Sequence, residues 1–146
     1  MKKFKQGIFL PINKQKYKGT LPIFYRSALE LKVFRKLDNN PLIISWGSET
    51  VIVPYFSPID KKIHRYYVDL NITILNNNRY ERYLIEIKPH AHTIAPTFSK
   101  RKKQQTMLYE QAMYCINQAK WAAAKEWAMK HNYNNFIIYT EKHLKG

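Results

Sequence analysis

The chain has 146 residues, of which 45% are hydrophobic and 14% aromatic, so it can form one domain with its own core. Its formal net charge of +15 predicts a polyanionic partner, usually nucleic acid and less often an anionic membrane surface. The one cysteine, Cys115, excludes an intramolecular disulfide and a multi-cysteine zinc site, and indicates a reducing compartment. No stretch reaches the length of a membrane span.

The N-terminal segment, residues 1 to about 22, carries many lysines together with Pro11, Gly19 and Pro22. Proline and glycine interrupt regular structure, and like charges repel each other. The segment is therefore predicted to be a basic, extended arm with little regular structure, followed by a single domain over residues 23–146. The lysines of this arm could bind DNA or pack on a partner protein.

The domain is expected to begin with a helix from about Ile23 to Leu37, because apolar residues recur there at helical spacing. The segment 38–41, Asp-Asn-Asn-Pro, should end this helix. Runs rich in Ile, Val, Tyr and Thr then predict four strands, separated by turn-like segments. These strands are expected over residues 42–46, 50–55, 64–75 and 83–88.

A long helix is predicted from about Gln105 to His131, and a final strand from Phe136 to Tyr139. The strand–helix–strand unit at the end of the chain should form a right-handed crossover, which makes the last strand parallel to the strand that ends at Lys88. The expected fold class is therefore α/β, with a mixed sheet and flanking helices. The positions predicted to line the buried face of the long helix are Leu108, Ala112, Cys115, Ala119, Ala123 and Trp127.

One group of residues carries a chemical signal: Asp69, and Glu86 with Lys88 two positions later. Alternate residues of a strand share a face, so Glu86 and Lys88 should point the same way. If the two predicted strands pair antiparallel through the Asn-rich turn, Asp69 can lie on that face too. Two carboxylates and a lysine would then meet at one spot.

Such an arrangement suits metal-assisted cleavage of a phosphodiester. Mg²⁺ prefers oxygen ligands and keeps several waters, so two carboxylates can hold it. The ion polarises the phosphate, and a lysine can orient the attacking water or stabilise developing charge. The alternative is a Glu-x-Lys pair on a solvated sheet face, which is common. Because an aspartate between Val68 and Leu70 is disfavoured in a strand, and the chain is strongly basic, the pattern favours catalysis.

Glu30 could add a third carboxylate. It lies in Leu29-Glu30-Leu31 of the predicted first helix, at the border of the buried stripe. In one interpretation it pairs with Arg26, four residues earlier, as helical neighbours of opposite charge do. In the other interpretation it is a further metal or water ligand.

These residues resemble a known pattern. Tyr25-Arg26-Ser27-Ala28-Leu29-Glu30, then Asp69, then Glu86-Ile87-Lys88 are similar to the PD-(D/E)xK motif of the restriction-endonuclease-like superfamily, and the first helix resembles that of TnsA-type transposon endonucleases. The resemblance to the head completion nucleases of T-even-like tailed phages spans nearly the whole chain, from about Tyr17 to Leu144. It is carried by Tyr17-Lys18-Gly19, Tyr25-Arg26-Ser27, the segments 57–66 and 83–89, and Tyr139-Thr140-Glu141-Lys142.

The resemblance implies a restriction-endonuclease-like fold and a DNA endonuclease that uses Mg²⁺, with Mn²⁺ as a substitute. It implies metal ligation by Glu30, Asp69 and Glu86, and assigns the lysine role to Lys88. The motif often has a proline before the aspartate, and Val68 stands there in this chain. That position shapes the backbone and supplies no ligand.

Further DNA contacts are expected from the basic run between the site and the long helix, Lys100, Arg101, Lys102 and Lys103. A polyanion would neutralise this run; the alternative is a solvated loop. Related nucleases often place a Gln or Lys of the long helix near the substrate, which makes Gln111 a candidate. The alternative for Gln111 is a solvent-facing polar stripe.

The resemblance also implies a role in finishing the packaged phage head, on packaged DNA ends or in head–neck assembly before the tail joins. The expected partners are double-stranded DNA and phage head and neck proteins, with no membrane, and the expected locations are the virion and the host cytoplasm. The rival interpretation is a structural protein of the virion neck that keeps the fold and binds DNA without cutting it.

Overall fold

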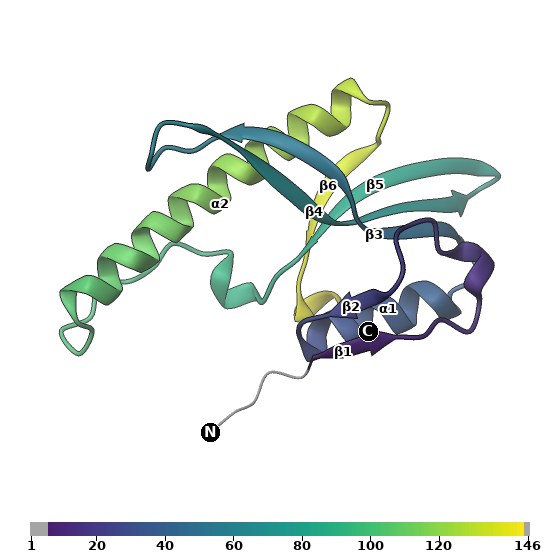
Figure 1. Cartoon of the computed structure of the whole chain (residues 1–146), viewed down its shortest axis with the longest axis horizontal. Coiled ribbons are helices and arrows are strands. Elements are labelled where there is room, and N and C mark those ends of the chain that lie inside the picture. Colours follow the sequence, from purple (N-terminus) through teal and green to yellow (C-terminus); the bar gives the residue numbers. More distant parts are fainter. Residues whose placement is uncertain (1–5, 145–146) are drawn as a thin grey trace.

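The computed structural model describes residues 6–144. Four strands form a mixed sheet in the order β3-β4-β5-β6, and within it β5 and β6 run parallel. Two helices and a two-stranded ribbon of β1 and β2 flank this sheet (Figure 1). In chain order the elements are β1 (Gly7–Phe9), η1 (Lys14–Lys16), β2 (Ile23–Tyr25), α1 (Ala28–Asn39), β3 (Ile43–Phe56), β4 (Ile63–Asn76), β5 (Arg79–Ile87), η2 (His90–His92), α2 (Gln104–Lys130), β6 (Asn135–Tyr139) and η3 (Glu141–Leu144), where η marks a 3-10 turn.

The sheet is the middle layer between two hydrophobic cores. On one face, α1 and the β1–β2 ribbon bury a cluster that contains Phe34, Trp46 and Leu70. On the other face, α2 buries a cluster that contains Leu84 and Trp121. Both faces of the central strands are therefore apolar, as in other layered α/β folds. The predicted α/β class is confirmed, and so is the parallel pairing of β6 with β5 across the α2 crossover.

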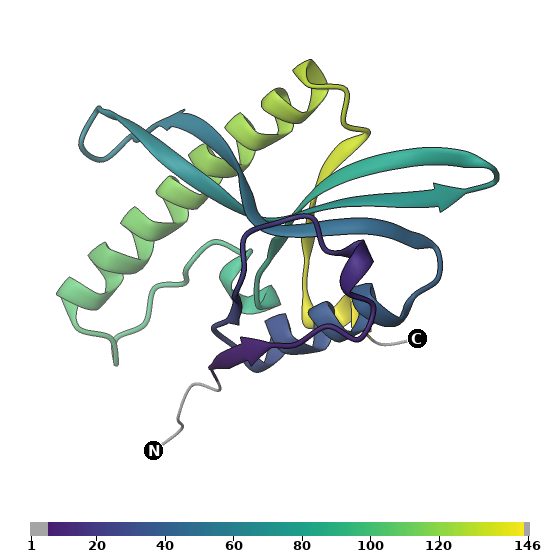
Figure 2. The ribbon, with the colours of Figure 1, turned by 45° about the vertical axis from the view of Figure 1, so that its right-hand side comes forward.

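The two hairpins of the sheet extend in different directions, which opens a fork between them (Figures 1 and 2). β4 pairs with β5 only from Leu70 to Asn76, while its first half pairs only with β3. The tight turn between β4 and β5 has positive φ at Asn77 (51°) and Asn78 (64°), as a type I′ turn requires. This turn fixes the register between β4 and β5, and β5 then runs back toward the fork.

β3 is one strand, where the sequence predicted two. A bulge between Ser48 and Val51 shifts its register with β4 but keeps the pairing on both sides. Glu49, inside the bulge, has a φ of 55°. A bulge adds residues to one strand only, so it bends the strand and increases its twist. The polar residues between the two predicted strands, which indicated a gap between them, form this bend instead.

The first helix begins at Ala28, later than predicted, because Ile23–Tyr25 is a strand that pairs with β1. Ile23 is buried while Phe24 is exposed, which is the alternation of a strand. Ser27 then caps the helix, since its Oγ accepts the N–H of Glu30 at 3.1 Å. The apolar residues that suggested an earlier helix start belong to the ribbon.

The prediction of little regular structure in the N-terminal segment is wrong for residues 6–22. β1 and η1 lie within this segment, and Phe9 is buried. The Phe9 ring packs against Phe34 and Trp46, with ring centroids 5.7 and 6.0 Å away. The basic residues at positions 2–5 lie outside the described residues. The described part of the segment covers the core because Phe9 is inserted into it.

The predicted buried face of α2 is confirmed in part: Ala119, Ala123 and Trp127 are partly buried against the core. The buried residues of α2 are Asn117, Trp121, Ala124 and Ala128, whereas Leu108 and Cys115 are exposed. The N-terminal half of α2 projects beyond the sheet, so no strand covers its apolar side chains there (Figure 1). Alanines on several sides of this helix also leave the phase of the buried stripe ambiguous in the sequence. Within residues 6–144, no helix is both long enough and apolar enough to cross a membrane.

We predict that Phe9→Ala lowers the free energy of unfolding by about 3–5 kcal/mol, because it removes a buried ring from the core. Ile8→Ala, one residue earlier on the same ribbon, is the matched control: Ile8 is 53% exposed, and its loss should cost no more than about 0.5 kcal/mol. Urea denaturation measures both. Equal small effects would show that β1 does not pack on the domain.

Candidate active site

Asp69 and Glu86 lie side by side at the fork. Leu70 of β4 pairs with Ile85 of β5, so Asp69 comes opposite Glu86 across the antiparallel pair. Asp69 Oδ2 accepts a hydrogen bond from the N–H of Ile87 at 2.8 Å. Backbone pairing between β4 and β5 ends at Leu70, and the Asp69 side chain replaces the next carbonyl. The structure therefore brings these two predicted carboxylates together.

The bulge of β3 lies directly across β4 from Asp69, because the register shifts between the pairs 48–70 and 51–68. A bulge of this kind bends the hairpin and changes where side chains point. Here the bend turns the β3–β4 hairpin away from β5, and Asp69 sits at the corner. Glu49 of the bulge forms an ion pair with Arg26, which precedes the cap of α1.

Glu86 is buried, and its carboxylate accepts a hydrogen bond from the hydroxyl of Tyr66 on β4. Burial, together with the charge of Glu86, raises the pKa of Tyr66, so the hydroxyl stays protonated as a donor. Lys120 of α2 places its Nζ 5.5 Å from the Tyr66 ring centroid. Partners of this kind fix the orientation of a carboxylate that binds a metal.

The carboxylates of Asp69 and Glu86 repel each other. Burial, and then the charge of Glu86, raise the pKa of Asp69 well above its usual range. The hydrogen bond from Ile87 and the charge of Lys88 act in the opposite direction. A cation between the carboxylates would relieve the repulsion, and carboxylate oxygens are the ligands that Mg²⁺ prefers. On these chemical grounds the pair fits Mg²⁺.

Glu30 stands in the first turn of α1, close enough to Asp69 for their charges to interact. Burial raises the pKa of Glu30, and the charge of Asp69 adds to the shift. Among residues 6–144, however, no three His, Cys, Asp or Glu side chains are grouped closely enough to hold a metal ion. The structure thus leaves Glu30 near Asp69 but outside the Asp69–Glu86 pair, and its role as a ligand stays a prediction.

In the alternative interpretation, Glu30 forms a helical ion pair with Arg26. Among the described residues no such ion pair is formed. Arg26 lies before the helix and binds Glu49 instead. Its hydrogen bond with Glu49 raises the pKa of Arg26, and the charges of Glu30 and Asp69 add to this. Arg26 therefore interacts through its charge with both Glu30 and Asp69.

Lys88 follows directly after β5. Its backbone N–H donates to the carbonyl of Tyr139 at 3.0 Å, which continues the pairing with β6. Its side chain lines a cleft of about 440 Å³ between the chain after β5 and the N-terminal half of α2. Glu86 and Lys88 are two residues apart in extended chain, so their side chains point to the same side. The lysine therefore lies between the acidic pair and this cleft.

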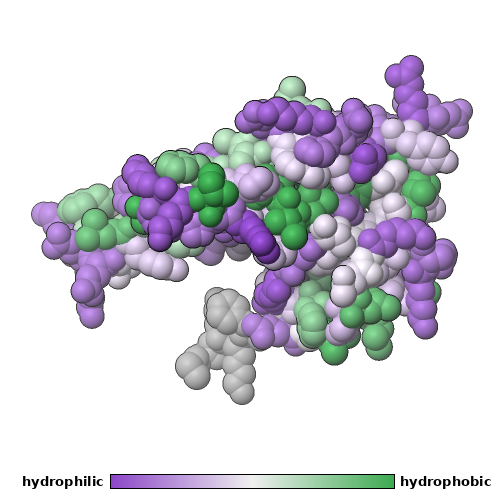
Figure 3. All heavy atoms as spheres, turned by 45° about the horizontal axis from the view of Figure 1, so that its top comes forward, coloured by the Kyte–Doolittle hydropathy of each residue, from purple (hydrophilic) through white to green (hydrophobic). Residues whose placement is uncertain are grey.

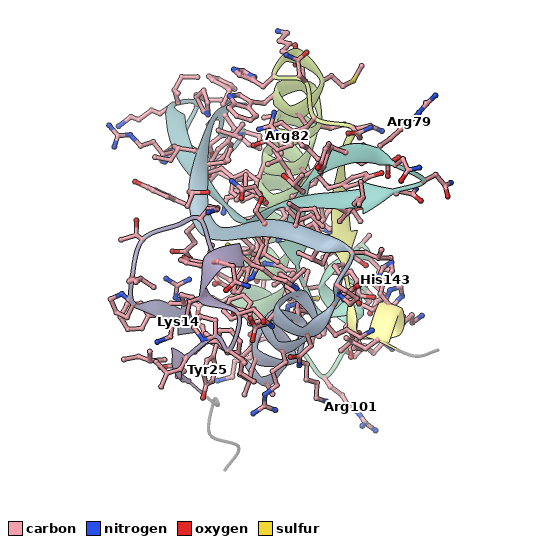
Figure 4. All side chains as sticks on the ribbon, turned by 90° about the vertical axis from the view of Figure 1, so that its right-hand side faces the viewer. Lys14, Tyr25, Arg79, Arg82, Arg101 and His143 are labelled. Carbon is pink, nitrogen blue, oxygen red and sulfur yellow. The ribbon has the colours of Figure 1, made fainter. Side chains whose placement is uncertain are left out.

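The basic run Lys100–Lys103 lies at the N-terminal end of α2. Lys102 pairs with Glu110 at 2.9 Å, while its three neighbours are exposed and form no ion pair within the described chain. Figure 4 shows Arg101 directed away from the molecule. The first turn of α2 has no acidic residue and no side-chain cap, so its positive helix end is uncompensated. Gln111 is exposed and lines a second cleft, of about 260 Å³.

Comparison with known proteins places this geometry in a family. Residues 40–141 match the family model described as TnsA-like endonuclease N terminal. The chain belongs to the TnsA-like endonuclease family. The Head completion nuclease of Enterobacteria phage T4 is 35% identical over 147 residues, which cover 96% of this chain and 93% of that protein. No solved structure matches the chain significantly.

Both resemblances predicted from the sequence are confirmed by these matches. The stretch that matches the TnsA-like endonucleases contains Asp69, Glu86 and Lys88, while Glu30 precedes it. The matched stretch therefore contains the acidic pair and the lysine together with the elements that carry them, the β4–β5 hairpin and the α2 crossover that follows it.

Sequence reasoning missed three features of this TnsA-like site. Tyr66 lies in the segment 57–66, which contributed to the resemblance, but the contact of its hydroxyl with Glu86 is seen only in the folded sheet. The Arg26–Glu49 pair depends on the bulge, which no local pattern indicated. Asn117 interrupts an apolar helix face beside Ile116, and that polar residue in a buried stripe was the available signal.

We predict that Asp69→Asn makes the metal-free protein more stable at neutral pH, by at least about 1 kcal/mol. The amide keeps an oxygen for the Ile87 N–H and removes the repulsion. Because the folded pKa of Asp69 is raised, the folded state binds this proton more tightly than the unfolded state. The cost of the charge is therefore absent at low pH and grows as pH rises from the usual carboxyl range through the raised pKa.

Denaturation curves from pH 4 to 8 in a chelator measure this difference. Glu126→Gln is the control, because the hydrogen bond from Lys130 lowers the pKa of Glu126 and its neutral form should not be more stable. A destabilised Asp69→Asn at neutral pH would contradict the repulsion.

Proposed function

We propose that the chain is a DNA endonuclease that uses Mg²⁺, with Mn²⁺ as a substitute, and cuts phosphodiester bonds at the fork between β4 and β5. The observation that carries the proposal is the acidic pair Asp69–Glu86, in which burial, and then the charge of Glu86, raise the pKa of Asp69, with Lys88 two residues after Glu86. Membership of the TnsA-like endonuclease family supports it.

DNA is the substrate that the charge of the chain favours. The formal net charge is +15, and binding to phosphates releases counterions from the DNA. Figure 3 shows a notch between the projecting part of the molecule and its main body, with hydrophilic side chains along it. Lys100, Arg101 and Lys103 lie at the uncompensated end of α2 and are proposed to bind phosphates, and Gln111, further along the same helix, is proposed as a further DNA contact. Lys102 is held by Glu110 and is the weakest of the four cations in this role.

The residues have distinct roles in the proposed reaction. When bound by Asp69 and Glu86, Mg²⁺ supplies polarisation of the scissile phosphate and favours loss of a proton from the attacking water. Lys88 orients that water or donates to the phosphoryl oxygen on which negative charge develops. Tyr66 holds the Glu86 carboxylate in one orientation. Glu30 is proposed as an auxiliary ligand that acts on the same site from the first turn of α1.

The proposed biological role follows the relative of phage T4, whose name is Head completion nuclease. We propose that the chain acts on packaged DNA ends or in head–neck assembly before tail joining, in the virion and in the host cytoplasm. Double-stranded DNA and head or neck proteins are the proposed partners. The rival is a structural neck protein that binds DNA through the same basic surface.

We predict that purified protein nicks or cuts supercoiled plasmid in Mg²⁺ or Mn²⁺, and that a chelator abolishes this. Asp69→Asn and Lys88→Ala should each lower the rate by about 10²-fold or more, because each removes charge that acts at the reacting phosphate. Lys125→Ala, an exposed lysine on α2, is the matched control and should cut normally. Cutting that survives both site substitutions would refute the site.

The same variants separate the nuclease from its rival. Asp69→Asn should fail to support infectious particles if cutting is needed for assembly. Infectious particles from a variant that is folded but does not cut would favour the structural role.

We predict that Tyr66→Phe raises the Mg²⁺ concentration for half-maximal cutting by about 10- to 100-fold, because Glu86 loses the donor that orients it. The rate should recover at saturating Mg²⁺. Tyr67→Phe, at the next and exposed position of β4, should leave the metal dependence unchanged. The same Mg²⁺ curve for Tyr66→Phe and wild type would show that Tyr66 does not position Glu86.

A further inference from the structure

The cleft of about 440 Å³ that begins at Lys88 has no role in the chemistry proposed above. It runs between residues 91–96 and the inner side of the N-terminal half of α2. Its volume is in the range of about 300–1,000 Å³ that is usual for sites of small organic groups. Lys88, the residue directly after β5, lines the cleft, so the cleft lies at the end of the strand that carries Glu86.

Asn117 is the buried polar group of this cleft. It is 8% exposed, it lines the cleft, and its side-chain amide makes no hydrogen bond with any described residue. Among the described residues, the one fully enclosed side-chain polar atom without a partner is Trp46 Nε1, so the Asn117 amide is not sealed off but accessible from the cleft. Asn117 also interrupts the buried stripe that continues with Trp121 and Ala124. An apolar residue would complete this stripe, so the amide is suited to a ligand that enters the cleft.

The walls of the cleft are aromatic and apolar. Tyr109 and Tyr114 line it from α2, and His92 and Ile94 line it from the segment after β5. Flat rings bind a nucleobase by stacking on its faces. An asparagine amide carries a donor and an acceptor side by side, which matches the edge of a base.

The charges around the cleft favour a polyanion such as a DNA strand over a basic peptide. The one acidic residue of the lining, Glu110, is paired with Lys102 of the basic run. Lys88 thus lines the cleft, and the Lys102–Glu110 ion pair connects the same cleft to the cations at the start of α2. A strand that enters along these cations would bring a phosphate to Lys88 and the neighbouring base to Asn117.

We propose that this cleft receives one unpaired nucleobase, next to the phosphate that is cut, and that the Asn117 amide hydrogen-bonds to the edge of that base. The inference rests on the proposed endonuclease function and names its substrate more closely. Removing a base from a duplex costs stacking and pairing energy, and this cost is smallest where the strand is already single. The protein should therefore favour frayed ends or single-stranded stretches over intact duplex.

The test is an abasic scan. Labelled single-stranded oligonucleotides carry one abasic residue at successive positions, and their cutting in Mn²⁺ and their binding in EDTA, by fluorescence anisotropy, are both measured. Wild type should lose about five-fold or more in binding and cutting when the abasic residue lies next to the cut bond, and little at distant positions. Asn117→Ala should bind and cut the complete and the abasic strand equally well.

Matched variants separate binding from folding. Gln118→Ala, at the next and exposed position of α2, should behave as wild type. Tyr109→Ala, at a 66% exposed residue of the cleft, should also lose the abasic effect, whereas Tyr109→Phe should keep it. Because Tyr109 is exposed, this pair tests the cleft even if Asn117→Ala is poorly folded.

The outcomes are distinct. An abasic effect in binding without cutting in any metal would refute the proposed endonuclease but retain the base-binding cleft. Cutting without an abasic effect at any position would refute the cleft and retain the endonuclease. Loss of infectious particles in Tyr109→Ala, together with normal cutting by this variant and no abasic effect in wild type, would assign the cleft to a protein partner and refute the inference.

Discussion

The hydrogen bond from the Ile87 N–H to Asp69 connects the architecture of the sheet to the chemistry of the site. Pairing between β4 and β5 stops at Leu70, and a buried N–H left there without a partner would be costly. Because a side chain takes this N–H, the two hairpins can separate without that cost. The same bond holds a carboxylate beside Glu86. The sheet therefore opens and acquires its acidic pair through a single side chain, and the β3 bulge across from it supplies the bend.

α2 serves two purposes along its length. Its C-terminal half packs on the sheet through Trp121, Ala124 and Ala128, and the two alanines allow close approach. Its N-terminal half projects beyond the sheet and carries the cleft and the basic run. A continuous helix over Gln104–Lys130 thus holds the proposed DNA contacts at a fixed distance from the acidic pair. Rigid placement of this kind is what an active site assembled from distant elements needs.

The arrangement of Asp69, Glu86 and Lys88 was largely predictable because it depends on local geometry. Strand alternation places Glu86 and Lys88 on one face, and an antiparallel hairpin with an Asn-rich turn brings Asp69 opposite Glu86. The N-terminal ribbon was not predictable, since a three-residue apolar run has no period to read, and Phe9 is stabilised only by distant rings. The buried positions of α2 were predicted only in part, because alanine is tolerated on any side of a helix and does not mark the buried one. The ion pair of Arg26 with Glu49 requires a bulge that forms only in the folded sheet.

The charge of Asp69 distinguishes the two biological interpretations. An amide at this position would accept the same hydrogen bond from Ile87 and would not repel Glu86, so the fold alone does not need a carboxylate there. What the carboxylate adds is negative charge at a place where that charge opposes folding. A purely structural protein gains nothing from this cost, whereas a site that binds a cation recovers it on binding. The acidic pair is therefore better explained by a nuclease than by a neck protein that only binds DNA.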